Sequence, residues 1–336
     1  MSADRTEPAA LRPPRSLSLV VPVFNEAAVL PEFYRRAVAA LDGAVGDWEL
    51  VFVNDGSGDE SLEILLGLHA QDARVAVIDL ARNFGKEAAM TAGFELAAGE
   101  AVGIIDADLQ DPPELIPALL AKLAEGYDIA YAKRSMRHGE TVLKRATASA
   151  FYRIIQRISR VQIPTDTGDF RIMSRRAVAA LLRLPERHRF MKGLFAWIGF
   201  RQAEVLYERH PRRGGETKFS YWRLWNFALE GITSFSSAPL KLLTYCGLAI
   251  ALMAFSFASV IVFRTLMYGN PVAGYPSLIT TVLFVGGVQL VAIGMLGEYI
   301  ARIYDEVKAR PLYLRKFVAN SALQRAGGAA DEGKGA

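Results

Sequence analysis

The sequence predicts an α/β domain with a doubly wound, mostly parallel sheet, followed by two membrane-spanning helices. Two observations predict the domain. Short apolar, β-branched runs alternate with helical patterns in the first part of the chain, and polar clusters follow the ends of these runs. A third observation predicts the membrane helices, because two long stretches near the carboxyl end carry no charged residue. The 336 residues are enough for this arrangement.

Apolar runs with the length of buried strands predict the sheet. They are Leu17–Val23, Glu49–Val53, Val75–Leu80, Ala101–Ile105 and Asp128–Ala132. After the first run, apolar residues between Val29 and Leu41 recur at three- and four-residue spacing, which is typical of a helix packed on a sheet. Because strands and helices alternate in this way, parallel strands are the default expectation.

Two capping boxes are expected to begin helices. In one, Ser57 caps the helix and Glu60 completes the box; in the other, Asp111 and Glu114 take these roles, with Pro112 at the first helical position.

The stretch Ile104–Glu114, with the sequence I-I-D-A-D-L-Q-D-P-P-E, joins a strand to a helix and contains two carboxylates, Asp106 and Asp108. Residues at this spacing in an extended chain point to the same side. Hard oxygen ligands suit Mg²⁺ or Mn²⁺, and Mg²⁺ usually leaves coordination positions to phosphate oxygens. The pattern predicts a metal–diphosphate site, whereas a bare D-x-D also occurs in ordinary surface turns.

Polar clusters fall just past three of the predicted strands. They are Asn25 with Glu26 after the first, Asp55 after the second, and Asp106 with Asp108 after the fourth. Each has an ordinary explanation as a turn or a cap, but together they mark the sheet edge where doubly wound folds bind ligands. Neither G-x-G-x-x-G after the first strand nor G-x-x-x-x-G-K-[ST] is present. A nucleotide diphosphate held through metal and carboxylates is therefore favoured over a Rossmann dinucleotide or a P-loop site.

Charge and composition indicate which classes of molecule the protein could bind. The net charge of +4 suits anionic lipid, phosphorylated substrates or nucleic acid, and its distribution favours the first two. The only cysteine, Cys246, lies in an apolar run, so no disulfide or cysteine metal site is expected. The four histidines are scattered and predict no metal cluster. Residues 1–15 are polar and Pro-rich, and we expect a disordered leader.

The uncharged stretches Leu242–Phe263 and Pro271–Gly297 predict transmembrane helices at 241–264 and 271–297. Aromatic residues in 220–240 indicate an interfacial helix before the first span. Lys and Arg flank both spans on the outer sides, so the α/β domain at 16–219, the tail at 298–336 and both termini are expected in the cytoplasm. Residues 319–336 are small and polar, which predicts disorder. The Gly-rich second span would permit close helix packing in a homo-oligomer.

The segment between the predicted sheet and the membrane is basic. Thr141–Arg160 contains no acid, and we expect an amphipathic helix at the membrane interface, with a solvated surface helix as the alternative. Thr167–Arg171 is interpreted as a polar turn. His210–Phe219 is a Gly-rich basic loop that could close over a diphosphate, or a plain solvated loop.

Five motifs together resemble glycosyltransferase family two. They are V-V-P-V-F-N-E, V-N-D-G-S-G-D, R-N-F-G-K, D-A-D-L-Q-D-P-P-E and T-G-D-F-R, in order between Leu17 and Lys218. The likeness is greatest to the polyprenyl-phosphate hexosyltransferases of the bactoprenol glucosyltransferase and dolichol-phosphate mannosyltransferase types. It implies an A-type glycosyltransferase fold, and the two-span tail resembles the bactoprenol type. Processive members carry Q-x-x-R-W, where this chain has Arg187–Gly193, so the resemblance implies a single transfer.

The resemblance also implies residue roles. Asp106, Asp108 and Gln110 would hold Mg²⁺ or Mn²⁺, and Asp106 could instead contact the ribose. Asp169 and Asp108 would be catalytic, Asp169 either as the base or as a group that positions the acceptor. The nucleotide sugar would contact Pro22, Asn25, Glu26, Asp55, Lys86, Asp106, Ala107 and Asp108. The phosphates of the acceptor and the donor would be bound by basic residues: Arg134, Lys144, Arg145, Arg171, Arg212 and Lys218.

The implied reaction is inverting transfer of a hexose from a nucleotide-diphosphate sugar to polyprenyl phosphate at the cytoplasmic face of a bacterial inner membrane. Glucose from UDP-glucose is the first choice, and GDP-mannose, UDP-galactose, UDP-N-acetylglucosamine or another acceptor are alternatives. A membrane scaffold without catalysis is the alternative from another class.

Overall fold

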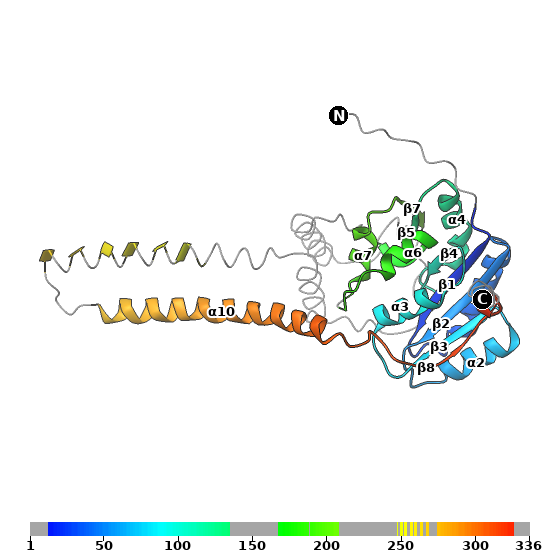
Figure 1. Cartoon of the computed structure of the whole chain (residues 1–336), viewed down its shortest axis with the longest axis horizontal. Coiled ribbons are helices and arrows are strands. Elements are labelled where there is room, and N and C mark those ends of the chain that lie inside the picture. Colours follow the sequence, from blue (N-terminus) through cyan, green and yellow to red (C-terminus); the bar gives the residue numbers. More distant parts are fainter. Residues whose placement is uncertain are drawn as a thin grey trace, which may run out of the picture. The chain divides into compact units, whose positions relative to one another are not determined.

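The computed structural model describes residues 13–134, 167–187, 189–207 and 274–325, together with scattered residues between 247 and 268 (Figure 1). The described residues form two compact units. One holds the residues up to 207 and those from Pro311 onward, and the other holds the residues between 247 and 310.

The first unit is built on one sheet, in the order β7-β5-β6-β4-β1-β2-β3-β8. β1 pairs in parallel with β2 and β4, and β2 pairs in parallel with β3, so the predicted parallel α/β core is confirmed. The bounds are β1 (Ser16–Val23), β2 (Asp47–Asn54), β3 (Val75–Leu80), β4 (Ala101–Ile104), β5 (Ile129–Arg134), β6 (Thr167–Ser174), β7 (Gln202–Tyr207) and β8 (Arg315–Ala319).

One strand replaces a predicted turn. Thr167–Arg171 belongs to β6, which runs antiparallel between β4 and β5, so the turn interpretation is wrong. Phe170 and Ile172 on β6 are fully buried, and this alternation supplies the apolar face of a strand. The fifth predicted strand, Asp128–Ala132, corresponds to β5, which pairs antiparallel with β6 and parallel with β7.

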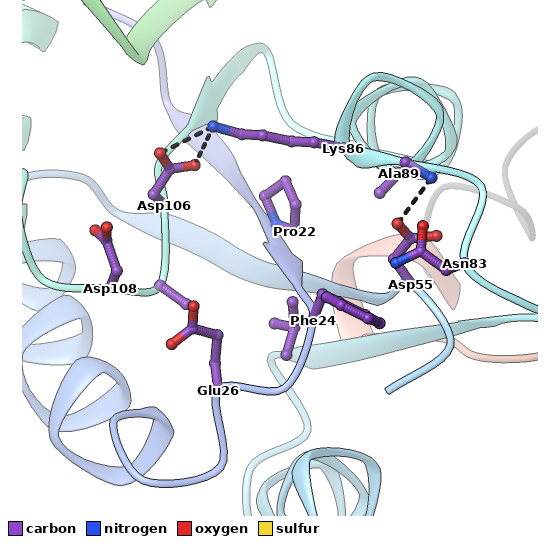
Figure 2. A pocket seen from close by; sticks show the side chains of 12 residues that line it. Pro22, Phe24, Glu26, Asp55, Asn83, Lys86, Ala89, Asp106 and Asp108 are labelled. Atoms are coloured by element: carbon purple, nitrogen blue, oxygen red, sulfur yellow. Dashed lines mark hydrogen bonds and ion pairs between the residues drawn. The ribbon is translucent and has the colours of Figure 1, made fainter. Parts of the chain in front are cut away.

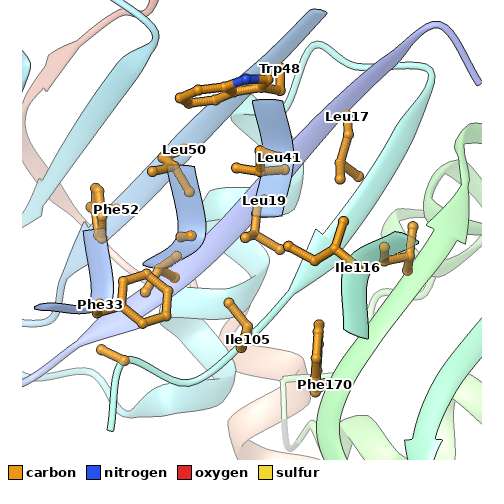
Figure 3. Packing of buried hydrophobic residues seen from close by; sticks show 14 of the residues in the cluster. Leu17, Leu19, Phe33, Leu41, Trp48, Leu50, Phe52, Ile105, Ile116 and Phe170 are labelled. Carbon is orange, nitrogen blue, oxygen red and sulfur yellow. The ribbon is translucent and has the colours of Figure 1, made fainter. Parts of the chain in front are cut away.

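Helices cover both faces of the sheet. The helices are α1 (Leu30–Asp42), α2 (Ser61–Gln71), α3 (Lys86–Leu96), the 3-10 turn η1 (Pro113–Leu115), α4 (Ile116–Ala124), α6 (Arg175–Leu182) and α7 (Met191–Trp197). One core lies between the sheet and helices α1 and α4, where Phe33 meets Phe52 edge to face with ring centroids 6.1 Å apart (Figure 3). Val20 points away from this core toward α3, because neighbouring strand residues alternate between faces.

The contact of α3 with β1 depends on Gly93. A Cβ atom at this position would lie 2.2 Å from Cγ1 of the buried Val20. We expect Gly93→Ala to lower the free energy of unfolding by about 1–3 kcal/mol through overpacking, measured by thermal or chemical denaturation. Gly67→Ala on α2 is the matched control, since nothing lies within 4 Å of its added Cβ. An equal response of the two variants would contradict this account.

The first predicted capping box is wrong. α2 begins at Ser61, and its N-cap residue, Glu60, makes no side-chain cap. The Ser61 N–H instead donates to Oδ1 of Asp59 at 3.0 Å. The hydroxyl of Ser57 accepts the backbone N–H of Asn25 at 3.0 Å, so it joins the ends of two strands rather than capping a helix.

The second capping box is also wrong. Pro112 precedes the 3-10 turn η1, and no side chain caps that turn. Asp111 is buried and accepts the hydroxyl of Tyr207, while Glu114 forms an ion pair with Arg36 at 2.8 Å. The side chains that suggested a cap are thus used in contacts between elements.

Among its described residues the second unit has one long helix, α10 (Tyr275–Lys308), which covers the predicted second span from Tyr275 to Gly297 and continues to Lys308. Within the described residues, one stretch, Phe284–Lys308, is long and apolar enough to cross a membrane. The scattered described residues of the predicted first span are helical, and the rest of that span lies outside the described residues. The same holds for residues 1–12 of the leader, the basic helix at 141–160, the loop at 210–219 and the interfacial helix at 220–240.

The carboxyl-terminal tail is ordered where we expected disorder. β8 adds an antiparallel edge strand to β3, and its last residue is Ala319. Beyond it, Ser321 is fully buried and donates its hydroxyl to the carboxylate of Glu49. The prediction of disorder is therefore wrong for residues 319–325, because Ala319 pairs with β3, Ser321 is buried against Glu49, and residues 322–325 form a helical turn.

Candidate active site

A pocket of about 410 Å³ opens at the carboxyl ends of the parallel strands. Its walls come from the ends of β1, β2 and β4 and from the segment that leads from β3 into α3. Figure 2 shows Asp106, Asp108 and Glu26 on one side and Asp55 and Asn83 on the other. The lining residues are Pro22, Val23, Phe24, Glu26, Asp55, Asn83, Gly85, Lys86, Ala89, Asp106, Ala107 and Asp108.

The pocket lies where the strand order reverses. β1 has β4 on one side and β2 on the other, and both pair with it in parallel. From β1 the chain goes on to β2 on one side of this point, and from β4 it goes on to β5 on the other side, so a crevice forms outside the strand ends. This explains why segments far apart in the sequence meet in a single pocket.

Asp55 holds the segment before α3. Its carboxylate accepts the backbone N–H groups of Phe84 at 2.7 Å and Gly85 at 2.9 Å. Burial raises the pKa of Asp55, although these two N–H groups act in the opposite direction. Gly85 has a φ of 97°, a conformation that side-chain-bearing residues avoid. Asp55 therefore shapes the pocket wall as well as facing into it.

Lys86 is the central cation of the described site. Its ammonium lies 2.6 Å from Oδ1 of Asp106 and also forms an ion pair with Asp169. Burial lowers the pKa of Lys86, but the two carboxylates outweigh it and raise the pKa above its ordinary value. The sequence indicated only a nucleotide-sugar contact for Lys86, and its bridging position was not foreseen.

Asp106 and Asp108 do not lie in an extended chain, contrary to the expectation from their spacing. β4 ends at Ile104, and Leu109 has a φ of 58°, so the chain turns between the two carboxylates and the next helix. Both nevertheless line the same pocket. Burial and the nearby charge of Asp169 raise the pKa of Asp106 against the effect of Lys86.

The two carboxylates fit a divalent ion that shares its coordination with a substrate. Among the described residues, no group of three or more His, Cys, Asp or Glu side chains could enclose a metal. Mg²⁺ is commonly held by one or two carboxylates together with substrate phosphates, and the pocket has this donor set. Gln110 donates its backbone N–H to Asp108 at 3.1 Å and does not line the pocket.

Asp169 on β6 is ionised at neutral pH. Burial raises its pKa, but the positive charges of Lys86, Lys192 and Arg171 prevail and hold the pKa at about 2. Arg171 is buried, with its guanidinium 3.8 Å from the centre of the Phe195 ring, and donates to the backbone oxygens of Gly168 and Asp169. Burial lowers the pKa of Arg171 to about 10. Arg171 thus supports the strand that carries Asp169, and phosphate binding by it stays a prediction.

Glu87 lies beside the pocket residue Lys86 and was not predicted as a site residue. It lies in the first turn of α3, and its Oε1 accepts the N–H of Met191 at 3.4 Å. Its Oε2 is buried and has no hydrogen-bond partner among the residues that the structure describes. Burial raises the pKa of Glu87 to about 8, and the negative charge of Asp169 adds to the effect. Only the position beside Lys86 could have drawn attention to it.

The raised pKa makes folding stability depend on pH. The pKa of Glu87 is 4.5 in the unfolded chain and about 8 in the folded protein. At pH values between these two, the folded state binds more protons than the unfolded state, so the stability of the protein falls as pH rises. We expect Glu87→Gln to remove this loss. The difference in Tm between the variant and wild type should therefore grow from about pH 5 to about pH 9, by the equivalent of a few kcal/mol of unfolding free energy. Thermal melts measure it, with the exposed Glu125→Gln as the control. A Tm difference that does not change with pH would contradict the assignment.

Several other predicted site residues do not line the pocket or lie outside the described residues. Asn25 adopts a φ of 56° and accepts the N–H of Gly58 at 2.8 Å, so its side chain joins two strand-end loops and is not part of the pocket lining. Five further residues line the pocket and were not predicted: Val23, Phe24, Asn83, Gly85 and Ala89. The side chains of Arg134, Lys144, Arg145, Arg212 and Lys218 lie outside the described residues, and their phosphate-binding roles stay predictions.

Comparison with known proteins identifies the family. Residues 18–182 match the model of glycosyl transferase family 2, and residues 238–303 match the GtrB C-terminal hairpin. The SfII prophage-derived bactoprenol glucosyl transferase of Shigella flexneri is 49% identical over 300 residues, which cover 89% of this chain and 97% of that protein. The chain belongs to glycosyltransferase family 2. It is therefore an enzyme, and the non-catalytic scaffold is set aside.

Two further relatives and one solved structure are similar to the chain. An uncharacterized glycosyltransferase of Synechocystis, sll0501, is 51% identical over 298 residues, covering 89% of this chain and 94% of that protein. A prophage bactoprenol glucosyl transferase homolog of Escherichia coli K12 is 47% identical over 302 residues, covering 90% and 99%. A glucosyl-3-phosphoglycerate synthase of Mycobacterium tuberculosis, solved with Mn²⁺ and UDP-glucose, has a TM-score of 0.44 at 20% identity and covers 69% of this chain and 80% of that one.

Proposed function

We propose that the protein transfers glucose from UDP-glucose to polyprenyl phosphate, with inversion and without processive elongation, at the cytoplasmic face of a bacterial inner membrane. The observation that carries the proposal is the convergence of Asp55, Asp106 and Asp108 on one pocket in a chain 49% identical to a bactoprenol glucosyl transferase. The apolar stretch Phe284–Lys308 and the match to a C-terminal hairpin support a membrane location, with the two predicted spans forming a multi-pass anchor.

On the donor side, Asp55, Phe24 and Asn83 form the wall for the nucleoside, and Asp106 and Asp108 face the diphosphate. A bound Mg²⁺ or Mn²⁺ would act as a Lewis acid that neutralises the charge developing on the departing nucleotide. Asp106 and Asp108 would hold it, with Gln110 supporting Asp108 through its backbone. Lys86 keeps Asp106 oriented and supplies positive charge to the same side of the pocket.

On the acceptor side, Asp169 serves as a positioning group rather than as the base. A phosphate monoester has its second pKa near 6, so the acceptor is mostly a dianion at neutral pH and needs no proton removed. Asp169, with a pKa of about 2 and an ion pair to Lys86, is a poor proton acceptor. Its role is to fix Lys86 between the donor and acceptor sides.

Asp169→Asn distinguishes these roles. We expect kcat to fall by no more than about tenfold, because the amide still accepts a hydrogen bond from Lys86, whereas loss of a general base costs about 10²–10⁴-fold. Initial rates of lipid-linked product, with the fold checked by thermal melting, are the measurement. A loss near the upper end of that range in a stably folded variant would restore the base role.

The function itself is tested with the purified full chain in detergent. It is incubated with polyprenyl phosphate, Mn²⁺ and one radiolabelled donor at a time: UDP-glucose, UDP-galactose, UDP-N-acetylglucosamine or GDP-mannose. We expect label in the lipid fraction with UDP-glucose. Label from another donor alone would revise the sugar, and label from none would refute the proposed reaction.

A further inference from the structure

The carboxyl-terminal tail lies against the parts of the fold that form the donor pocket. β8 covers the outer edge of β3, with Val77 opposite Ala319 and Asp79 opposite Phe317. β3 leads directly into the segment that supplies Asn83, Gly85 and Lys86 to the pocket. Figure 1 shows β8 beside β3, so the last described strand is one element away from the segment that lines the pocket.

Two contacts before β8 hold both ends of this pocket segment. Ala81, at the end of β3, donates its N–H to the oxygen of Leu314 at 2.8 Å. Tyr313 donates its hydroxyl to Glu95 in the last part of α3. The residues between these two anchors include Asn83, Gly85 and Lys86. The tail thus fixes where the segment starts and where its helix ends.

A third contact reaches toward Asp55. The ammonium of Lys316 lies 3.4 Å from Oδ2 of Asp79, which is only 2% exposed. Oδ1 of Asp79 accepts the side-chain amide of Asn54 at 2.7 Å, and Oδ1 of Asn54 accepts the N–H of Ser57 at 3.3 Å. Asn54 and Ser57 bracket Asp55, so this hydrogen-bonded chain runs from β8 to the turn that carries a pocket carboxylate.

The same turn packs tightly against the segment after β3. Gly56 has a φ of 68°, and an added Cβ would lie 2.5 Å from the backbone carbon of Arg82. Asp55 in turn binds the N–H groups of Phe84 and Gly85. A shift of β3 or of its continuation would therefore move both walls of the pocket together.

We propose that residues 313–319 are a working part of the donor site, in which Tyr313 and Lys316 are positioning residues that set the affinity for the nucleoside diphosphate. Because α10 ends at Lys308 and β8 begins at Arg315, the chain leaving α10 enters this support within six residues, 309–314. The inference rests on the proposed function insofar as the pocket binds a nucleoside diphosphate.

The test compares Lys316→Met, Tyr313→Phe and the double variant with Lys122→Met, all in the full chain. Lys122 lies on α4, outside the tail and the pocket lining, and it also forms a partly exposed ion pair, with Glu125, so it is the matched control. Titration calorimetry with UDP and with GDP, each in the presence of Mn²⁺, gives Kd, and steady-state assays separate KM for the donor from kcat. We expect each single variant to raise Kd and donor KM about threefold to fivefold, and the double variant to raise them about tenfold, with kcat and Tm nearly unchanged. Lys316→Arg is expected to restore Kd.

The outcomes are distinct. A wild-type protein that binds neither UDP nor GDP would overturn the proposed function and the inference that rests on it. Wild-type binding with an unchanged Kd in the double variant would overturn the inference alone. A raised Kd that follows a lower Tm and is not restored by Lys316→Arg would also overturn it, because the tail would then support only the fold.

Discussion

Asp108→Ala is expected to abolish nearly all sugar transfer. Asp108 lines the pocket beside Asp106, and among the described residues no group of three or more His, Cys, Asp or Glu side chains could hold a metal, so the ion would depend on these two carboxylates. Stabilisation of a leaving diphosphate by a held metal contributes several kcal/mol, so we expect kcat to fall by about 10³-fold or more. The measurement is label transferred to polyprenyl phosphate at saturating donor and Mn²⁺.

Asp47→Ala is the control for this prediction. Asp47 is an exposed carboxylate at the amino end of β2, at the opposite edge of the same sheet, and its removal should leave turnover unchanged. Full turnover of a folded Asp108→Ala enzyme would refute the metal–diphosphate assignment and the mechanism built on it.

Lys86→Met is expected to produce the second largest loss. The variant leaves Asp106 and Asp169 facing each other without the ammonium that bridges them. Repulsion between the two carboxylates would displace both groups, and the site would lose a positive charge beside the leaving group. We expect kcat/KM to fall by about 10²-fold, as for removal of one strong electrostatic contact in an active site.

The control and the rescue for Lys86→Met are both available in the chain. Lys122→Met breaks a partly exposed ion pair with Glu125 on α4 and should leave kcat/KM unchanged. Lys86→Arg keeps the charge and should recover part of the lost activity. A Lys86→Met enzyme with normal kcat/KM would show that the bridge is not used in the reaction.

The parallel core and the pocket could be read from the sequence because both depend on local patterns. β1 to β4 are apolar runs of strand length, and Asp55, Asp106 and Asp108 follow their ends, where the topology of a doubly wound sheet brings them together. The prediction failed where a residue's partner is far along the chain. β6 was mistaken for a turn because its polar start hides the alternation of Phe170 and Ile172.

The same limit explains what was missed in the site. The bridge from Lys86 to Asp169 joins residues 83 positions apart, and nothing in the local sequence predicts it. Asp111 and Ser57 fit capping patterns, yet the side chains of both accept hydrogen bonds from residues far along the chain. The tail was judged by its small, polar composition, although Ser321 is fully buried against Glu49.

The edge strand β8 has a practical consequence for making a water-soluble form of the enzyme. Cutting the chain before the predicted hydrophobic hairpin would also discard β8. The N–H and C=O groups on the outer edge of β3 would then lack partners, and such an exposed edge strand promotes aggregation. A better design would remove the hairpin and join residues 311–325 to the α/β domain through a flexible linker, so that β8 still pairs with β3.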